Sequence, residues 1–202
     1  MLEFKKCIKH DPTGYVLSSW NEESIDFDGC PSSWNGVLCN VGNFVGVVLD
    51  NLGLSADSDL SVFSNLSKLV KLSMSNNSIS VKLPNNIAGF TSLEFLDISN
   101  NLFSSSKQDG IRKFGSLQNL SFAGNNFSGP IQNSISEMAS IKSLDLIRNT
   151  LSGVLPSSLT KLNSLVSLNL SHNRFTGKVP KGFELISSLE RLDLHGNMFI
   201  VL

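Results

Sequence analysis

Three histidines and three cysteines are the side chains of this 202-residue chain that could most readily act as general bases, nucleophiles or metal ligands. His172 and His195 occur late in the chain, whereas Cys7 occurs near its start, too far away for a Cys–His catalytic pair. A phosphate-binding loop is also missing, because Gly177-Lys178 is followed by Val179 and not by Ser or Thr. The sequence therefore predicts no enzyme activity in this chain, no metal centre and no cofactor.

Two of the cysteines lie close together. Cys30 and Cys39 enclose a short segment that contains Trp34. They could be metal ligands, but no second Cys or His pair completes a zinc site. A disulfide bond is the favoured interpretation, and it requires an oxidising compartment. The third cysteine, Cys7, is left over as a free thiol or as a partner for another chain.

Asn-x-Ser triplets provide candidate sites for N-glycosylation. They support secretion only weakly, because an Asn- and Ser-rich chain produces such triplets by chance. Asn119 and Asn169 fall on strand positions that we expect to point outward, so glycans there would block part of the surface that these strands form. The candidate acceptors are Asn65, Asn76, Asn119, Asn126 and Asn169.

The composition excludes several classes of partner. A net charge of −1, with 16% charged residues, gives no electrostatic basis for binding nucleic acid or an anionic membrane surface. The first residues lack the apolar stretch of a signal peptide, and no run of about 18 apolar residues could span a bilayer. Since other features indicate secretion, we expect this chain to be a piece of a longer protein.

An asparagine recurs every 24 residues and closes the phrase apolar-x-x-apolar-x-apolar-x-x-Asn-x-apolar. A period of this length predicts a solenoid of stacked coils that share one core, and the phrase is that of a leucine-rich repeat. The predicted fold class is an α/β solenoid, a right-handed superhelix or horseshoe. We expect residues 1–43 to form an amino-terminal cap and residues 44–202 to form seven repeats, the last one incomplete. The recurring asparagines are Asn77, Asn101, Asn125, Asn149, Asn173 and Asn197.

Each coil combines a strand, a turn and a helical segment. Alternating apolar residues such as Leu96 and Ile98 predict short strands that pair into a parallel sheet on the concave side. The amide of each recurring Asn can satisfy backbone groups buried in the following turn, which predicts a ladder of hydrogen bonds. Phe at four of the six positions two residues later predicts a stacked aromatic spine. Those six positions are Ile79, Phe103, Phe127, Leu151, Phe175 and Phe199.

The second half of a coil follows a Ser/Thr-Gly-x-apolar-Pro phrase, as in residues 152–156 and 176–180. Glycine there permits a positive φ, and proline ends strand pairing. Apolar residues three apart then predict a 3₁₀ or one-turn helix on the convex side. We expect irregular structure where the phrase fails, at residues 104–108 and at Gln132, which replaces proline.

The cap carries the most specific motifs. Ser19-Trp20-Asn21 precedes the cysteine pair, and Trp34-Asn35-Gly36-Val37 lies inside it. A short helix is expected to end before Asp11-Pro12-Thr13-Gly14. Together with the Ser/Thr-Gly-x-apolar-Pro phrases, these motifs make nearly the whole chain resemble the extracellular domains of plant leucine-rich-repeat receptor-like kinases.

This resemblance implies a repeat fold of plant type with a disulfide-stapled amino-terminal cap. It also implies a non-catalytic recognition module on the extracellular side of the plasma membrane, in a parent protein whose membrane span and kinase or pseudokinase domain lie outside this chain. Its implied partners are a protein or peptide ligand, a cell-wall fragment, and possibly a co-receptor. Two alternatives remain open at this point: a secreted inhibitor of wall-degrading enzymes, and an intracellular interaction scaffold with reduced cysteines. Free thiols at both Cys30 and Cys39 in the native protein would exclude the extracellular interpretation.

Outward-facing strand and turn positions supply the candidate ligand-binding residues. The alternative is an ordinary solvated face, on which Asp145 pairs with Arg148 or Arg191 pairs with Asp193 at small energetic gain. The candidates are Phe95, Asp97, Asp145, Ile147, Arg148, His172, Arg191, Asp193 and His195.

The last coil stops at Leu202, after 14 of its 24 positions. Apolar residues such as Leu192, Leu194 and Ile200 then have no following coil. We therefore expect the isolated chain to fray or aggregate at this end, and added coils to restore its solubility. A monodisperse, cooperatively unfolding chain would contradict this expectation.

Overall fold

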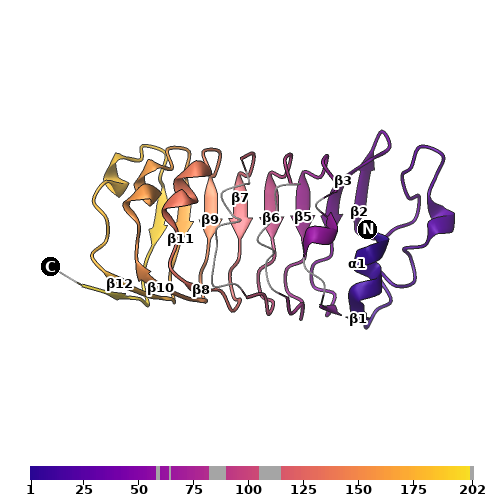
Figure 1. The fold of residues 1–202 in the computed structure, drawn as a ribbon, viewed down its shortest axis with the longest axis horizontal. Helices are drawn as coiled ribbons and strands as arrows, with labels where there is room; N and C mark the ends of the chain where they lie inside the picture. Colours follow the sequence, from indigo (N-terminus) through magenta and orange to yellow (C-terminus); the bar gives the residue numbers. More distant parts are fainter. Residues whose placement is uncertain (58–59, 64, 82–89, 105–114, 201–202) are drawn as a thin grey trace.

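A computed structural model describes residues 1–57, 60–63, 65–81, 90–104 and 115–200. Its coils lie side by side in a row that runs from the amino-terminal cap to the last coil (Figure 1). One strand from each coil contributes to an eight-stranded sheet, in the order β13-β11-β9-β7-β6-β5-β3-β2. Pairing from β3 to β13 is parallel and in register, with Leu72 opposite Leu96 and Leu96 opposite Leu120. The predicted parallel sheet is confirmed.

The strands of this sheet are short because each coil must turn after a few residues. Only β2 is antiparallel to its neighbour, β3, and it comes from the cap. The strands are β2 (Val37–Asn40), β3 (Asn43–Val48), β5 (Lys71–Ser73), β6 (Phe95–Asp97), β7 (Asn119–Ser121), β9 (Ser143–Asp145), β11 (Ser167–Asn169) and β13 (Arg191–Asp193).

A second parallel sheet, which the sequence did not predict, runs along the lower edge in Figure 1. Three of its strands contain a Ser/Thr-Gly pair, and the predicted positive φ is present at Gly153 (+81°) and Gly177 (+74°). A Cβ at Gly177 would lie 2.8 Å from Val154 Cγ1 of the preceding coil, so glycine also permits the close stacking. The strands are β8 (Ser128–Gly129), β10 (Thr150–Val154), β12 (Arg174–Gly177) and β14 (Met198–Phe199).

Single 3₁₀ turns complete the coils, as predicted. They are η2 (Leu60–Phe63), η4 (Asn133–Glu137), η5 (Ser157–Lys161) and η6 (Phe183–Leu185). Their inward residues are buried, for example Leu159 and Leu162. The corresponding residues Ile87, Ile111 and Phe114, and the irregular segment expected at 105–108, lie outside the described residues.

The irregularity expected at Gln132 is wrong. Gln132 precedes η4 with φ −79° and ψ 152°, nearly the same extended backbone as Pro156 before η5, with φ −71° and ψ 139°. Proline favours this conformation but does not create it. The stacking of neighbouring turns therefore suffices to hold the glutamine in place.

The asparagine ladder is present at each of the six recurring positions. In Asn125 the amide nitrogen donates to the carbonyl of Ile98 (2.9 Å) in the preceding coil, and the side-chain oxygen accepts from the backbone N–H of Phe103 (2.9 Å). The same pattern repeats at Asn101 and Asn149. These side chains join successive coils where the backbone turns out of the sheet.

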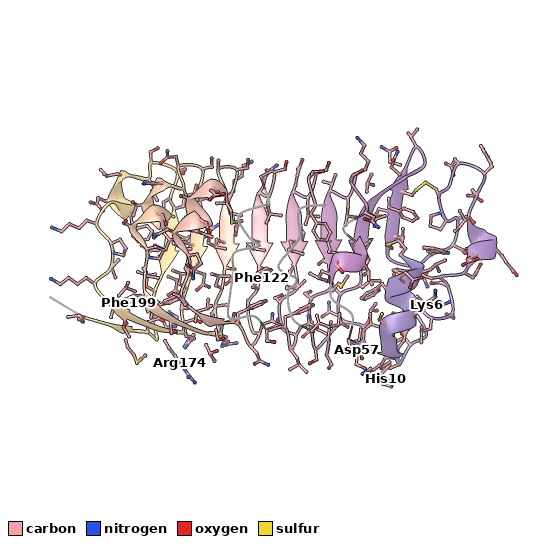
Figure 2. The ribbon with its side chains drawn as sticks, in the orientation of Figure 1. Lys6, His10, Asp57, Phe122, Arg174 and Phe199 are labelled. Carbon is pink, nitrogen blue, oxygen red and sulfur yellow. A yellow bond between two sulfur atoms is a disulfide. The ribbon has the colours of Figure 1, made fainter. Side chains whose placement is uncertain are left out.

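Aromatic rings fill parts of the core, as expected. Phe103, Phe127 and Phe175 are fully buried, and Phe175 stacks on Phe199 with ring centroids 6.5 Å apart. Figure 2 shows Phe122 inside the row of coils and Phe199 at its far end. At that end Leu192 is 40% exposed, whereas Leu168, its partner one coil earlier, is 1% exposed.

The cap closes the opposite end of the core. Its helix α1 (Leu2–Cys7) leads into β1 (Ile8–His10), which pairs with β4 (Ser55–Ala56) of the first coil. Trp20 stacks on Trp34 at 5.4 Å, and both are buried. The predicted disulfide bond between Cys30 and Cys39 is present, and η1 (Glu22–Ser24) precedes it.

Candidate functional site

The outward side chains of the eight-stranded sheet, with the turns that follow its strands, form a surface that we call the strand face. Leu96, Leu120 and Leu144 at the strand centres point inward and are buried. Side chains alternate along a strand, so the flanking residues point outward. The column after the buried residue holds Val48, Ser73, Asp97, Ser121, Asp145, Asn169 and Asp193.

The structure divides the nine predicted ligand-binding residues into two groups. Phe95 and Asp97 lie on β6, and the ammonium group of Lys71 sits 4.9 Å from the centroid of the Phe95 ring. The other seven lie on β9 and β13 or in the turns after β9, β11 and β13. Strand β7 separates the groups, so the candidates do not form one continuous cluster.

One turn position is left-handed in every coil. It directly precedes the recurring Asn, and four of its occupants are residues that tolerate positive φ well, Asn76, Asn100, Gly124 and Gly196. Arg148 (φ +54°) and His172 (φ +53°) are the exceptions in adjacent coils. The position in the first coil is held by Asn51. Both exceptional side chains are exposed on the strand face.

The two late histidines are in direct contact. His172 Nε2 and His195 Nε2 are 2.8 Å apart, and the ring planes are nearly perpendicular, at 82°. His195 Nδ1 lies 2.6 Å from the Asp193 carboxylate. An ionised carboxylate only accepts hydrogen bonds, so His195 donates from Nδ1. This donation from the ring lowers the pKa of Asp193, and the backbone N–H of His195 adds to the effect.

The expected pairing of Arg191 with Asp193 is therefore wrong. The histidine is held beside the carboxylate by the turn, whereas the long Arg191 side chain remains exposed. Its guanidinium approaches Glu190 at 3.9 Å and Ser167 Oγ at 3.4 Å. These exposed contacts contribute little stability.

The expected pairing of Asp145 with Arg148 is also not found among the described residues. The Asp145 carboxylate turns back to accept from the backbone N–H of Ile147 at 3.1 Å. Burial raises the pKa of Asp145, and the like charges of Asp97 and Asp193 raise it further, against the opposing hydrogen bond. Arg148 therefore presents its charge to solvent.

The glycosylation candidates differ in accessibility. Asn65, Asn76, Asn119 and Asn126 are exposed. Asn169 is half-buried, and its side-chain oxygen accepts from both the backbone N–H (3.1 Å) and the hydroxyl (2.7 Å) of Ser171. Asn119 and Asn169 both lie on the strand face, so a glycan at either would cover part of it.

Sequence reasoning missed two features of this surface. It placed His172 and His195 in neighbouring columns but did not predict their hydrogen bond. It also missed the left-handed backbone at Arg148 and His172. The sequence did contain a signal for the left-handed backbone, because Asn or Gly precedes the recurring Asn in most of the other coils.

Two kinds of feature are absent from the described ranges. No group of three or more His, Cys, Asp or Glu side chains is placed to hold a metal ion there. Within the same ranges, no helix has the length and apolar character needed to cross a membrane.

Comparison with known proteins places this architecture in a family. The leucine-rich repeat profile matches residues 49–103, 115–175 and 139–199, and the leucine-rich repeat N-terminal domain profile matches residues 1–40. A stretch of 96 residues is 74% identical to the LRR receptor-like serine/threonine-protein kinase GHR1 of Arabidopsis thaliana. That match covers 48% of this chain and 9% of the relative, so this chain spans a small part of that protein's length.

Solved structures agree with this result. A pollen receptor kinase 3 structure superposes with a TM-score of 0.84 at 26% identity, covering 99% of this chain and 94% of that one. The plant peptide hormone receptor RGFR1, solved in complex with RGF2, superposes with a TM-score of 0.68 at 30% identity, covering 71% of this chain and 23% of the receptor. Because both the cap and the coils are matched, this chain belongs to the leucine-rich repeat family, in the form found in plant receptor kinases.

Proposed function

We propose that this chain is the amino-terminal part of a non-catalytic extracellular recognition module of a plant receptor-like kinase. In this proposal residues 1–43 cap a stack of repeats that extends over residues 44–202. The strand face binds an extended peptide that carries an acidic group. A co-receptor is the alternative partner, on the same face or on its flank.

The observation that carries this proposal is the pair of strained, exposed residues Arg148 and His172. A left-handed backbone costs a residue with a Cβ about 1–2 kcal/mol, and Asn or Gly fills the same position in the other coils. Strain of this kind is retained where the side chain has a use. Neither side chain contributes to the buried core, so binding is the use that remains.

The chemistry around these residues suits a peptide. Arg148 presents a guanidinium that no acidic side chain of the described residues neutralises, and such a group binds carboxylates in a bidentate manner. Half-buried Ile147 offers apolar contact beside it. RGFR1, a plant peptide hormone receptor of similar structure at 30% identity, was solved in complex with RGF2.

Extracellular localisation is part of the proposal. The Cys30–Cys39 disulfide persists in oxidising compartments, which argues against an intracellular scaffold. Four of the five glycosylation candidates are exposed. Similarity to a receptor kinase favours a membrane receptor over a secreted inhibitor.

Peptide selection on the disulfide-bonded chain tests the proposal. Peptides selected from a random library would be measured against Arg148→Asn and Lys161→Asn, each of which removes one exposed positive charge. We expect Arg148→Asn to weaken binding by about 10- to 100-fold, the effect of losing a charge-assisted hydrogen bond of roughly 1.5–3 kcal/mol. Lys161 lies on η5, away from the strand face, and its replacement should leave affinity unchanged.

The Asn variant also guards against misfolding, because Asn suits the left-handed backbone. Its melting temperature should equal or exceed that of the parent chain. Failure to select any binder, or equal binding to both variants, would contradict a peptide site at Arg148.

A further inference from the structure

We propose that His172 and His195 form a two-histidine chelating site for a divalent transition-metal ion of the zinc, nickel or copper(II) class. The two Nε2 atoms meet on the strand face at 2.8 Å, and both rings are exposed. This inference goes beyond the proposed peptide recognition and does not depend on it. It also revises the expectation, drawn from the sequence, that the chain has no metal site.

The separation of the two nitrogens matches a chelate. Imidazole nitrogens bind these ions at about 2.0–2.1 Å, so two of them at right angles on one ion are about 2.9 Å apart. Tetrahedral coordination requires about 3.3 Å, a small further opening of the pair. Imidazole selects zinc, nickel and copper over magnesium and calcium, which prefer oxygen ligands.

Asp193 orients one of the two rings. Since its carboxylate accepts the Nδ1 proton of His195 at 2.6 Å, the Nε2 atom of neutral His195 carries a lone pair directed toward His172. A carboxylate behind a ligating histidine fixes its tautomer and raises its basicity. In the metal-free pair His172 donates from Nε2. When an ion binds, the His172 proton transfers through solvent to its Nδ1, so that both Nε2 atoms offer lone pairs and both rings stay neutral.

The backbone orients the second ring. The N–H of His172 donates to the carbonyl of His195 at 2.9 Å, which joins the two turns. Gly196 lies against the His172 ring, and a Cβ there would be 2.8 Å from His172 Nδ1. Any side chain at position 196 would therefore move the imidazole from its place.

The remaining coordination positions face away from the protein. No third His, Cys, Asp or Glu of the described residues joins the pair. Water, or a side chain of a bound partner, completes the coordination sphere. We therefore expect a labile site with lower affinity than a structural site with four protein ligands.

Titration of the tag-free chain with ZnCl₂ or NiCl₂, followed by calorimetry and by NMR of the imidazole protons, tests this inference. We expect one ion per chain, with shifts at His172 and His195 and none at His10, which lies at the cap end (Figure 2). Binding should be lost at acidic pH, because a protonated imidazole has no free lone pair.

Variants separate ligation from folding. His172→Asn places a residue suited to φ +53° at this position, so it should fold at least as stably while losing affinity at least 10-fold. Asp193→Asn should weaken binding by about 10-fold or more with both ligands still present. His10→Ala and Cys7→Ser, the matched controls, should leave affinity unchanged.

Two results would overturn the site. One is binding by the parent chain that is no tighter than binding by His172→Asn. The other is loss of binding on replacement of His10 or Cys7. The peptide experiment measures the contribution of Arg148 to peptide binding without added metal. The peptide site and the metal site can therefore fail independently of each other.

Discussion

At the scale of single residues, the strand face combines groups that stabilise the fold with groups that weaken it. Asn125 satisfies buried backbone groups. Arg148 and His172, in contrast, carry backbone strain, and Asp145 carries a charge that its surroundings disfavour. Residues that lower stability and remain exposed are the ones whose retention calls for a function.

Asp145→Asn should raise the free energy of unfolding at neutral pH. Burial and the like charges of Asp97 and Asp193 raise the pKa of Asp145, so the folded chain binds this proton more tightly than the unfolded chain does. The ionised carboxyl therefore destabilises the fold above the raised pKa, and this effect disappears below the unfolded value. The asparagine oxygen can still accept from Ile147.

Urea unfolding at neutral and at acidic pH would measure this effect. Asp57→Asn is the control with the opposite sign, because the hydrogen bond from Lys9 lowers the pKa of Asp57. Replacement of Asp57 should not increase the free energy of unfolding at neutral pH. Equal changes in the free energy of unfolding for the two variants, or no increase for Asp145→Asn, would contradict a destabilising effect of burial and like charges at Asp145.

At the scale of elements, the turn after each strand depends on the asparagine ladder. Strands of three residues form few hydrogen bonds of their own. The Asn side chain adds bonds to the preceding coil and to its own turn. The ladder therefore makes neighbouring coils cooperative, which a solenoid with contacts only between adjacent repeats requires.

Asn125→Ala should lower the free energy of unfolding by about 3–5 kcal/mol. It leaves the buried N–H of Phe103 and the carbonyl of Ile98 without their partner, at roughly 1–3 kcal/mol each, and it removes further bonds within the turn. The neighbouring Asn126 is exposed, and Asn126→Ala should change stability by no more than about 0.5 kcal/mol. Denaturant unfolding of unglycosylated protein would compare them, and similar losses for the two would refute the ladder's role.

At the scale of the whole molecule, the two ends of the coil stack differ. The cap covers one end with aromatic rings, a strand pairing and a disulfide bond. In the last coil Leu192 is 40% exposed. Because each coil contacts only its neighbours, unfolding can begin at an end and spread inward.

Replacing both Cys30 and Cys39 by serine should destabilise the cap by about 2–3 kcal/mol, the loop-closure value for this short separation. Both tryptophans, Trp20 and Trp34, lie in the cap, so their fluorescence reports its unfolding. The unfolding midpoint measured by tryptophan fluorescence should fall further than the midpoint measured by backbone circular dichroism, which reports mainly on the coils. Cys7→Ser should shift neither signal, and a global shift of equal size would contradict a local role.

The sequence by itself determined the coil. A 24-residue period sets which leucines point inward, where the ladder asparagines stand and where the 3₁₀ turns of the described coils lie, because these depend on spacing within one repeat. The cysteine pairing and the family resemblance followed from local motifs in the same way.

Only the tertiary structure decided what happens between coils. The contact of His172 with His195 joins side chains one coil apart. The choice of His195 over Arg191 as the partner of Asp193 is made within one coil, by how the turn after β13 orients the histidine ring. The regular backbone at Gln132 likewise appears only in the folded chain. The repeat specifies where such side chains start, but ring orientation and backbone strain are settled by packing against the next coil. Residues that are distant in sequence meet there.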